Sequence, residues 1–221
     1  MNIFYWVVKG LAWPVARVYL RFRRYGQALV PRAGACILVG NHTSYLDAAM
    51  LGSACPRPVR FLISAEIYRL LRLRWFYYMM RAIPLRTDAG DSRALRAALH
   101  ALRAGEAVGI FPEGQRMKDG RLGEGKLGVA FLAWRSGAPV IPAAIVGAHL
   151  AMPVGASLPR PVPVHVCFGE PIRFETANER PDRDELIEFA TEVMRRIMKL
   201  AETPPERLGV DAMGQDQVGS P

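Results

Sequence analysis

Short apolar runs recur along the chain and are separated by longer stretches with helical periodicity. The runs are four to eight residues long and rich in Val, Ile and Leu, a pattern typical of strands buried on both faces of a sheet. Strands are therefore predicted at residues 36–40, 58–63, 82–85, 107–111, 139–146 and 163–168.

The stretches between these runs place apolar residues three or four positions apart, as one face of a helix requires. Gly105, Gly137 and Pro139 mark ends of such stretches. Helices are predicted at residues 47–53, 66–80, 91–103, 127–136 and 183–200. Strands that alternate with helices indicate a single α/β layered domain, with a largely parallel or mixed sheet flanked by helices.

The two ends of the chain differ from this alternating region. Residues 1–25 mix apolar and basic side chains and predict an amphipathic helical segment that binds membranes. Residues 203–221 have no hydrophobic period, so we expect a disordered tail there. The folded domain is expected to cover residues 26–202, because no linker divides that region.

The net charge of +9 and the pI near 9.9 indicate an anionic partner, such as nucleic acid, anionic lipid or a phosphorylated substrate. Residues 1–35 contain six Lys and Arg residues and no acid, and large apolar residues lie between these cations. This mixture favours an anionic bilayer surface over nucleic acid. No run of about 18 uncharged apolar residues occurs, so the sequence predicts surface association rather than a spanning helix.

Residues 67–81 form a second mixed segment, with five aromatic residues among four arginines. The apolar residues cover more than one face of the predicted helix. Two interpretations stay open: a core helix whose arginines extend outward, or an interfacial helix that enters the bilayer surface. Both can hold at once.

The three cysteines, Cys36, Cys55 and Cys167, are widely spaced and lie in apolar surroundings. They indicate neither a disulfide framework nor a zinc site, and no metal site is predicted. Lys9 and Pro14 interrupt the first apolar stretch and the charge cluster follows it, so a cleaved signal peptide is not expected. We therefore expect a peripheral or monotopic protein on the cytoplasmic face of a membrane.

A histidine and an aspartate follow the first of these apolar runs. CILVG leads directly into NHTSYLD, which places His42 at the carboxyl end of the strand and Asp47 at the start of the next helix. Open α/β sheets bind ligands at this end of their strands. The imidazole can act as a general base while the carboxylate fixes its tautomer, as in a Ser-His-Asp triad with a substrate hydroxyl replacing the serine. The alternative is a turn histidine beside a helix-capping aspartate.

Three further segments carry special residues beside predicted strands. In AVGIFPEGQR a buried strand ends in a tight turn with Glu113, Gly114 and Arg116, where the glycine permits close backbone approach and the guanidinium matches phosphate oxygens. Arg86 follows the strand in RAIPLR, and Pro142 in VIPAAI marks an edge, a bulge or backbone beside a ligand. Each segment alone is also compatible with ordinary loop structure.

The order NH-x4-D, RAIPLR, FPEGQR and VIPAAI resembles the glycerophospholipid acyltransferase family of PlsC type, from about residue 26 to 172. The resemblance implies transfer of a fatty acyl group from acyl-CoA or acyl carrier protein to 1-acyl-sn-glycerol-3-phosphate, which gives phosphatidic acid. It implies that His42 is the general base and Asp47 its partner. The resemblance also implies a phosphate site made of two arginines and a lysine, beside a turn that Glu113 and Gly114 shape. The substrate-binding residues implied are Asn41, Arg86, Glu113, Gly114, Arg116 and Lys126.

The expected partners are an anionic membrane surface, a lysophospholipid acceptor and an acyl thioester donor, with no nucleic acid and no cofactor besides the donor. Two departures from the family pattern concern the acceptor. Gln115 stands where the family commonly has Thr or Ser, and Pro84 stands where it has an apolar residue. The acceptor is therefore open between lysophosphatidic acid and another lysolipid.

Rival functions fit less well. GRLGEGKL, residues 120–127, nearly matches the nucleotide-binding loop G-x-x-x-x-G-K-[ST], but Leu127 lacks the hydroxyl that would hold Mg²⁺. The G-x-S-x-G motif of serine hydrolases is absent from the sequence. A non-catalytic basic module on a membrane surface stays as the alternative, although positive charge alone requires neither His42 nor Asp47.

Overall fold

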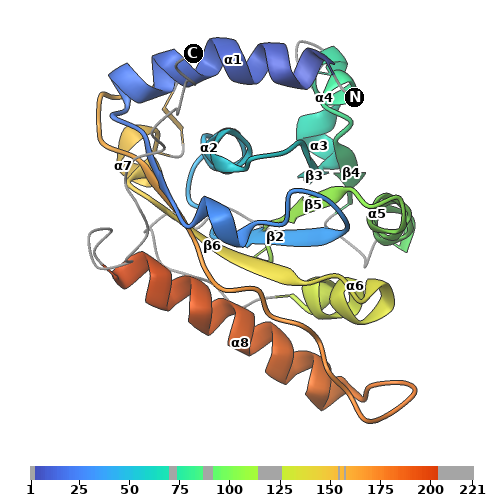
Figure 1. Ribbon diagram of the computed structural model, residues 1–221. Helices are drawn as coiled ribbons and strands as arrows, with labels where there is room; N and C mark the ends of the chain where they lie inside the picture. Colours follow the sequence, from blue (N-terminus) through green and yellow to red (C-terminus); the bar gives the residue numbers. More distant parts are fainter. Residues whose placement is uncertain are drawn as a thin grey trace, which may run out of the picture.

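The computed structural model describes residues 3–69, 74–86, 92–113, 126–153, 155–156 and 158–203 (Figure 1). Of the predicted functional residues, Gly114 and Arg116 lie outside the described residues. The predicted tail, apart from Thr203, also lies outside them.

A seven-stranded mixed sheet forms the centre of the molecule, in the order β1-β7-β6-β2-β5-β3-β4. Strands β6, β2, β5, β3 and β4 run parallel, β7 is antiparallel to β6, and β1 is parallel to β7. The prediction of an α/β layered domain with a largely parallel or mixed sheet is therefore confirmed. The strands are β1 (Arg23–Tyr25), β2 (Cys36–Gly40), β3 (Val59–Ser64), β4 (Ile83–Leu85), β5 (Ala107–Ile110), β6 (Val140–Val146) and β7 (His165–Phe168).

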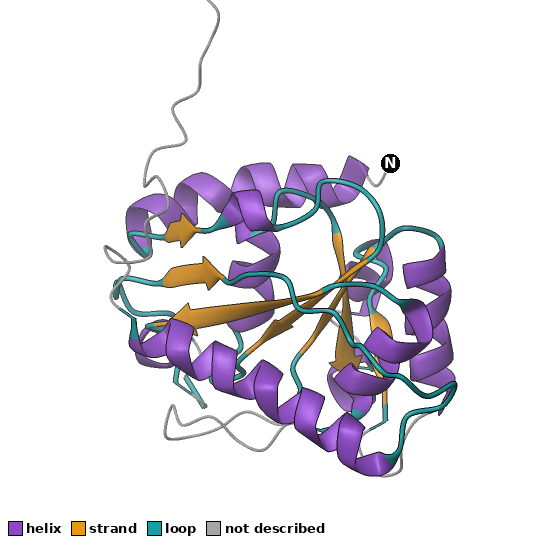
Figure 2. Cartoon of the chain, turned by 60° about the horizontal axis from the view of Figure 1, so that its bottom comes forward, coloured by secondary structure: helices purple, strands orange, loops and turns teal. Residues whose placement is uncertain are grey.

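Helices cover both faces of the sheet (Figures 1 and 2). On one face Leu38 of β2 packs in a buried cluster with Leu51, and on the other Ile37 packs in a cluster with Leu102 and Ile197. The first face carries α1 (Ile3–Tyr19), α2 (Asp47–Ala54) and α7 (Ala148–Ala151), and the second carries α5 (Ser92–Arg103), α6 (Gly128–Ser136) and α8 (Arg183–Glu202).

Helix α1 is docked onto the end of α2. The Tyr5 hydroxyl donates to the Gly52 carbonyl oxygen at 2.9 Å, and the Lys9 ammonium donates to the Cys55 carbonyl oxygen. Ala16 and Leu20 are buried against the first face of the sheet. These contacts satisfy carbonyl groups that the end of a helix leaves without intrahelical partners. No helix in the described ranges is long and apolar enough to cross a membrane.

The structure departs from the predicted elements in two places. Strand β1 lies within the segment predicted to be helical. The sequence did not predict this strand because Arg23 and Arg24 leave no apolar run, although Tyr25 is buried. The helix predicted at residues 66–80 contains α3 (Ala65–Tyr68) and a separate α4 (Arg74–Met79), and residues 70–73 between them lie outside the described residues. Helix α3 ends at a C-cap, Arg69.

Candidate active site

Five parallel strands end at one edge of the sheet, and three of them bring predicted site residues to that edge. His42 follows β2, Glu113 follows the neighbouring β5, and Arg86 follows β4 two strands beyond. Polar side chains that are far apart in the sequence therefore share the edge where open α/β sheets bind ligands.

His42 and Asp47 form a hydrogen-bonded pair. His42 Nδ1 lies 3.0 Å from Asp47 Oδ2, and the same carboxylate oxygen accepts from the backbone N–H groups of Thr43 at 2.6 Å and Ser44 at 2.7 Å. The Asp47 side chain is fully buried, whereas 20% of the His42 side chain is exposed. The carboxylate therefore fixes both the imidazole and the loop that carries it.

This geometry determines which ring nitrogen of His42 can act as a base. An ionised carboxylate only accepts hydrogen bonds, so Nδ1 carries the proton that it donates to Asp47. Nε2 then holds the lone pair of the neutral imidazole. The ring also stacks on Phe111, with centroids 4.4 Å apart and planes inclined by 19°. Rotation of the imidazole is thus restrained at its face as well as at its edge.

Glu113 is the second buried carboxylate of the site. Its side chain is 6% exposed, and Oε2 accepts a hydrogen bond of 3.2 Å from the backbone N–H of His42. The Lys126 backbone N–H donates to the Pro112 carbonyl oxygen at 2.9 Å, so the Lys126 backbone lies beside this turn. The turn after β5 thereby holds the His42 backbone and positions a lysine near it.

Asn41 links the end of β2 to β6. Its amide nitrogen donates to the Ile145 carbonyl oxygen at 2.9 Å, and its amide oxygen accepts from the Ile145 N–H at 2.7 Å. Asn41 is 5% exposed, so both bonds are buried. The side chain fixes the strand end from which His42 projects.

Replacing Asn41 with alanine is expected to lower stability by about 2 to 5 kcal/mol, because two buried backbone groups of Ile145 lose their partners. Urea unfolding measures the change. A variant of unchanged stability with a raised KM for the acceptor would instead support a direct role in substrate binding.

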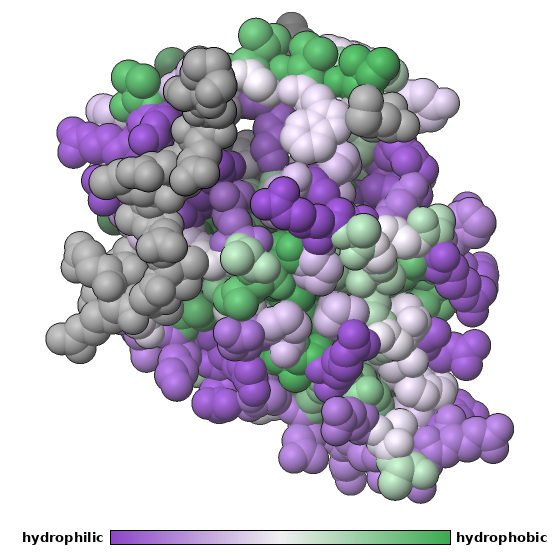
Figure 3. Space-filling view, in the orientation of Figure 1, coloured by the Kyte–Doolittle hydropathy of each residue, from purple (hydrophilic) through white to green (hydrophobic). Residues whose placement is uncertain are grey.

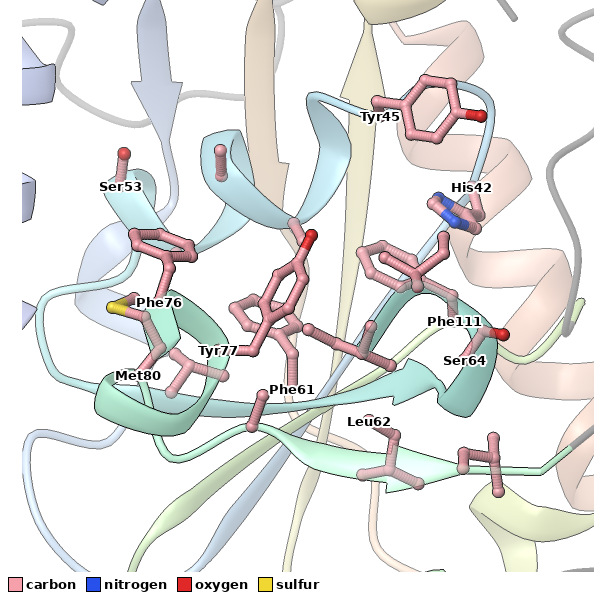
Figure 4. Close-up of a pocket in the computed structure, with 18 of the residues that line it drawn as sticks. His42, Tyr45, Ser53, Phe61, Leu62, Ser64, Phe76, Tyr77, Met80 and Phe111 are labelled. Carbon is pink, nitrogen blue, oxygen red and sulfur yellow. The ribbon is translucent and has the colours of Figure 1, made fainter. Parts of the chain in front are cut away.

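A cavity of about 730 Å³ extends from His42 along the first face of the sheet (Figure 4). In Figure 4 His42 and Phe111 lie at one end, Tyr77 near the middle, and Ser53 at the other end. Most of its lining is apolar and comes from β3, α2, α1 and α4. The candidate base therefore stands at one end of a long apolar cavity.

The end of the cavity beside α1 carries two polar groups whose pKa values are shifted by burial. Burial raises the pKa of the Tyr5 hydroxyl and lowers the pKa of Lys9 to about 8, with nearby charges contributing less. Both groups already donate to carbonyl oxygens at the end of α2. Both therefore line this end of the cavity with side chains that are already hydrogen-bonded.

The structure brings His42, Glu113 and Lys126 to one cavity, with Asp47 directly behind the histidine. Arg86 is exposed at the same sheet edge, where its neighbour Leu85 lines the cavity. Phe111 supports the imidazole, and α1 and α4 form cavity walls; the sequence predicted none of these roles. The described residues contain no group of His, Cys, Asp and Glu side chains able to hold a metal ion, and the three cysteines are buried thiols.

Comparison with known proteins agrees with this geometry. Residues 21–146, more than half of the chain, match the family model described as Acyltransferase. The chain belongs to the acyltransferase family. The match covers the His42–Asp47 pair, Arg86 and the turn at Glu113.

Named relatives of this family come from plants and bacteria. A chloroplastic 1-acyl-sn-glycerol-3-phosphate acyltransferase of Brassica napus is 34% identical over 55% of this chain and 36% of the relative. The enzyme of the same name from Bacillus subtilis is 24% identical over 80% of this chain and 86% of the relative. The chain thus spans about a third of the length of the plant relative.

A solved structure shares the fold. The 1-acyl-sn-glycerophosphate acyltransferase PlsC from Thermotoga maritima superimposes with a TM-score of 0.64 and 25% identity, over 82% of this chain and 73% of that chain. The acyltransferase family therefore accounts for both the motifs and the arrangement of the sheet.

Proposed function

We propose that this protein transfers a fatty acyl group from an acyl thioester to the free hydroxyl of 1-acyl-sn-glycerol-3-phosphate, with His42 as general base. The observation that carries the proposal is the His42–Asp47 pair at one end of a long apolar cavity. The names of the relatives support the acceptor. The donor is acyl-CoA or acyl carrier protein, and the product is phosphatidic acid.

In the proposed reaction, the acceptor hydroxyl oxygen attacks the carbonyl carbon of the thioester. His42 Nε2 takes the hydroxyl proton as the new C–O bond forms, and Asp47 stabilises the resulting imidazolium. The C–S bond then breaks, and the imidazolium returns the proton to the leaving thiolate. The acceptor hydroxyl takes the part that a serine plays in a triad.

The acyl chain of the thioester donor is assigned to the cavity. Its volume of about 730 Å³ lies within the range of about 300 to 1,000 Å³ that is usual for small-molecule pockets. Phe61, Ile63 and Met80 line it with apolar surface, which a hydrocarbon chain can cover without loss of hydrogen bonds. The reacting carbonyl carbon would then lie near His42.

The acceptor phosphate is assigned to the rim that holds Lys126, with Arg86 and Arg116 as further cations. Replacing Lys126 with alanine is expected to raise the KM for lysophosphatidic acid by about tenfold, because a charge-assisted contact is lost. The KM for a phosphate-free monoacylglycerol should not change.

Steady-state kinetics on both acceptors measure the Lys126 effect. Lys199→Ala, which removes an exposed lysine from α8, is the matched control. Equal losses on both acceptors would remove Lys126 from the phosphate site.

The outward sides of α1 and α4 are proposed to lie on an anionic bilayer surface at the cytoplasmic side. Leu11 of α1 is 71% exposed and Tyr78 of α4 is 72% exposed. Phe4 contacts Trp75 with ring centroids 5.9 Å apart, so the two helices meet. Figure 3 shows hydrophobic side chains gathered along the top of the molecule, over α1. Apolar residues beside basic ones are typical of interfacial helices.

The double variant Leu11→Ala/Tyr78→Ala is expected to bind anionic vesicles about tenfold or more weakly, because both side chains supply exposed apolar area. Vesicle sedimentation measures binding. Ile187→Ala, on α8 at the opposite face of the sheet, is the control and should bind like the wild type. Equal binding by all three proteins would place the membrane contact elsewhere.

The activity itself is tested by offering purified protein one long-chain acyl thioester and a panel of lysolipids. Mass spectrometry of the products is expected to show phosphatidic acid, formed faster than any other acylated lipid. If another lysolipid is acylated faster, the proposed acyl transfer stands but the proposed acceptor is wrong. Binding to vesicles without any acylated product, with both donor types tried, would support the non-catalytic module.

A further inference from the structure

A second pocket, of about 440 Å³, lies at the same edge of the sheet as His42. Val146 ends β6, which runs parallel to β2, and it pairs with His165 of β7. His165 in turn pairs with Arg23 of β1. The last residues of α8 also line the pocket, so it opens on the α8 face, opposite the apolar cavity.

Two guanidinium groups dominate the charge of this pocket. Arg21 and Arg23 are two residues apart, both line the pocket, and both side chains are exposed. Within the described part of the chain neither guanidinium has a hydrogen bond or an ion pair. His165 adds an imidazole, and Glu202 is the one carboxylate among the described lining residues. Two fixed positive charges thus face one negative charge in a concave site.

The backbone at Arg21 adopts a conformation that is unusual for arginine. Arg21 follows the end of α1 with a φ angle of 43°, in the left-handed region where glycine is the usual residue. A glycine would relax the backbone, whereas arginine keeps a cationic side chain at a steric cost. Strain of this kind, when retained, is typical of functional positions.

The position of the pocket restricts its ligand. Arg23 lies three strands from β2, or about 14 Å at the usual spacing of about 4.8 Å between strands. The phosphate of a glycerol phosphate is only a few bonds from the free hydroxyl and cannot span that distance while the hydroxyl is at His42. The pantetheine arm that separates a donor thioester from its phosphate is several times longer.

We propose that Arg21, Arg23 and His165 form a second phosphate-binding site, distinct from the site for the acceptor phosphate. Arginine is suited to this ligand because its planar fork matches phosphate oxygens. The phosphate ester is assigned to the pantetheine-linked acyl donor, because the pocket opens on the α8 face whereas the proposed membrane contact lies on α1 and α4. The headgroup of a bilayer lipid is the alternative that the test separates. The donor assignment rests on the proposed function, and the headgroup assignment does not.

Binding measurements with the full-length chain test the site and separate the two sources. The double variant Arg21→Gln/Arg23→Gln keeps polar side chains at both positions and removes both charges. Arg180→Gln, two residues before the N-cap of α8, is the control at the other end of a helix about 30 Å long. The probes are coenzyme A, phosphate-free pantetheine, and vesicles with or without phosphatidylglycerol.

We expect the double variant to bind one phosphate-bearing probe about tenfold more weakly than the control does. Weaker binding of coenzyme A, with pantetheine unaffected, assigns the site to the donor, and weaker binding to phosphatidylglycerol vesicles assigns it to a lipid headgroup. Equal binding of both probes by the double variant and Arg180→Gln overturns the site. Because binding is measured without turnover, a failure of the catalytic proposal would not affect this result.

A single substitution separates binding from folding. Arg21→Gly is expected to raise the melting temperature, because glycine relaxes the left-handed backbone, and to weaken binding of the same phosphate-bearing probe. A structural role alone predicts a lower melting temperature with binding unchanged, and that result would contradict the proposal.

Discussion

Replacing His42 with alanine is expected to lower turnover by about 10²- to 10⁴-fold, because Nε2 is the base that removes the acceptor proton. The fold should be retained, since the imidazole makes one side-chain hydrogen bond and is 20% exposed. Asp47→Asn should be nearly as harmful, because the neutral amide no longer stabilises the imidazolium. Steady-state rates with a long-chain donor and lysophosphatidic acid measure both effects.

Ser44→Ala is the control for this pair. The Ser44 hydroxyl donates to the Met152 carbonyl oxygen at 2.8 Å, so its role is to hold the loop. The variant should keep most of the wild-type rate per folded molecule, as judged by its melting curve. If His42→Ala kept more than about a tenth of the wild-type rate with a normal melting curve, the assignment of the base would be wrong.

Filling the apolar cavity is expected to produce the second large effect. Ser53 lines the cavity from α2 at the end opposite His42 (Figure 4), so the variant Ser53→Phe should occupy space at the far end. A long acyl chain would then lose room for several methylene groups. We expect kcat/KM for a long-chain donor to fall by more than about tenfold, while short-chain donors are used nearly as well as before.

Kinetics across donors of increasing chain length measure this change in preference. Ser53→Ala is the matched control, because it alters polarity with little change in volume. An equal loss for every donor length, or no change for any, would place the acyl chain outside this cavity.

The sheet could be predicted because its central strands are short apolar runs between glycine and proline residues. The pair of His42 and Asp47 could be predicted because both residues lie in one segment, five positions apart. Strand β1 could not be predicted, since its formation depends on pairing with β7, far along the chain. A charged edge strand of three residues leaves no periodic signal.

The cavity depends even more on distant packing. Its walls combine Tyr5 of α1, Phe76 of α4 and Phe61 of β3, which the sequence separates widely. For residues 67–81 the sequence left two interpretations open, a core helix and an interfacial helix. Helix α4 is compatible with both, because Phe76 lines the cavity while Tyr78 is exposed. Likewise, the sequence placed Asn41 within the NH-x4-D motif, as a substrate-binding residue, but only the fold shows its two bonds to Ile145.

In the proposed reaction the acceptor hydroxyl attacks the thioester directly, with no acyl group held on the protein. A rapid-mixing experiment with the donor alone tests this claim most directly, because free thiol and the mass of the protein can be followed together. We predict no burst of thiol without acceptor, and equal amounts of thiol and phosphatidic acid once lysophosphatidic acid is added. A burst of about one thiol per protein in the absence of acceptor, accompanied by a protein heavier by one acyl group, would contradict the account.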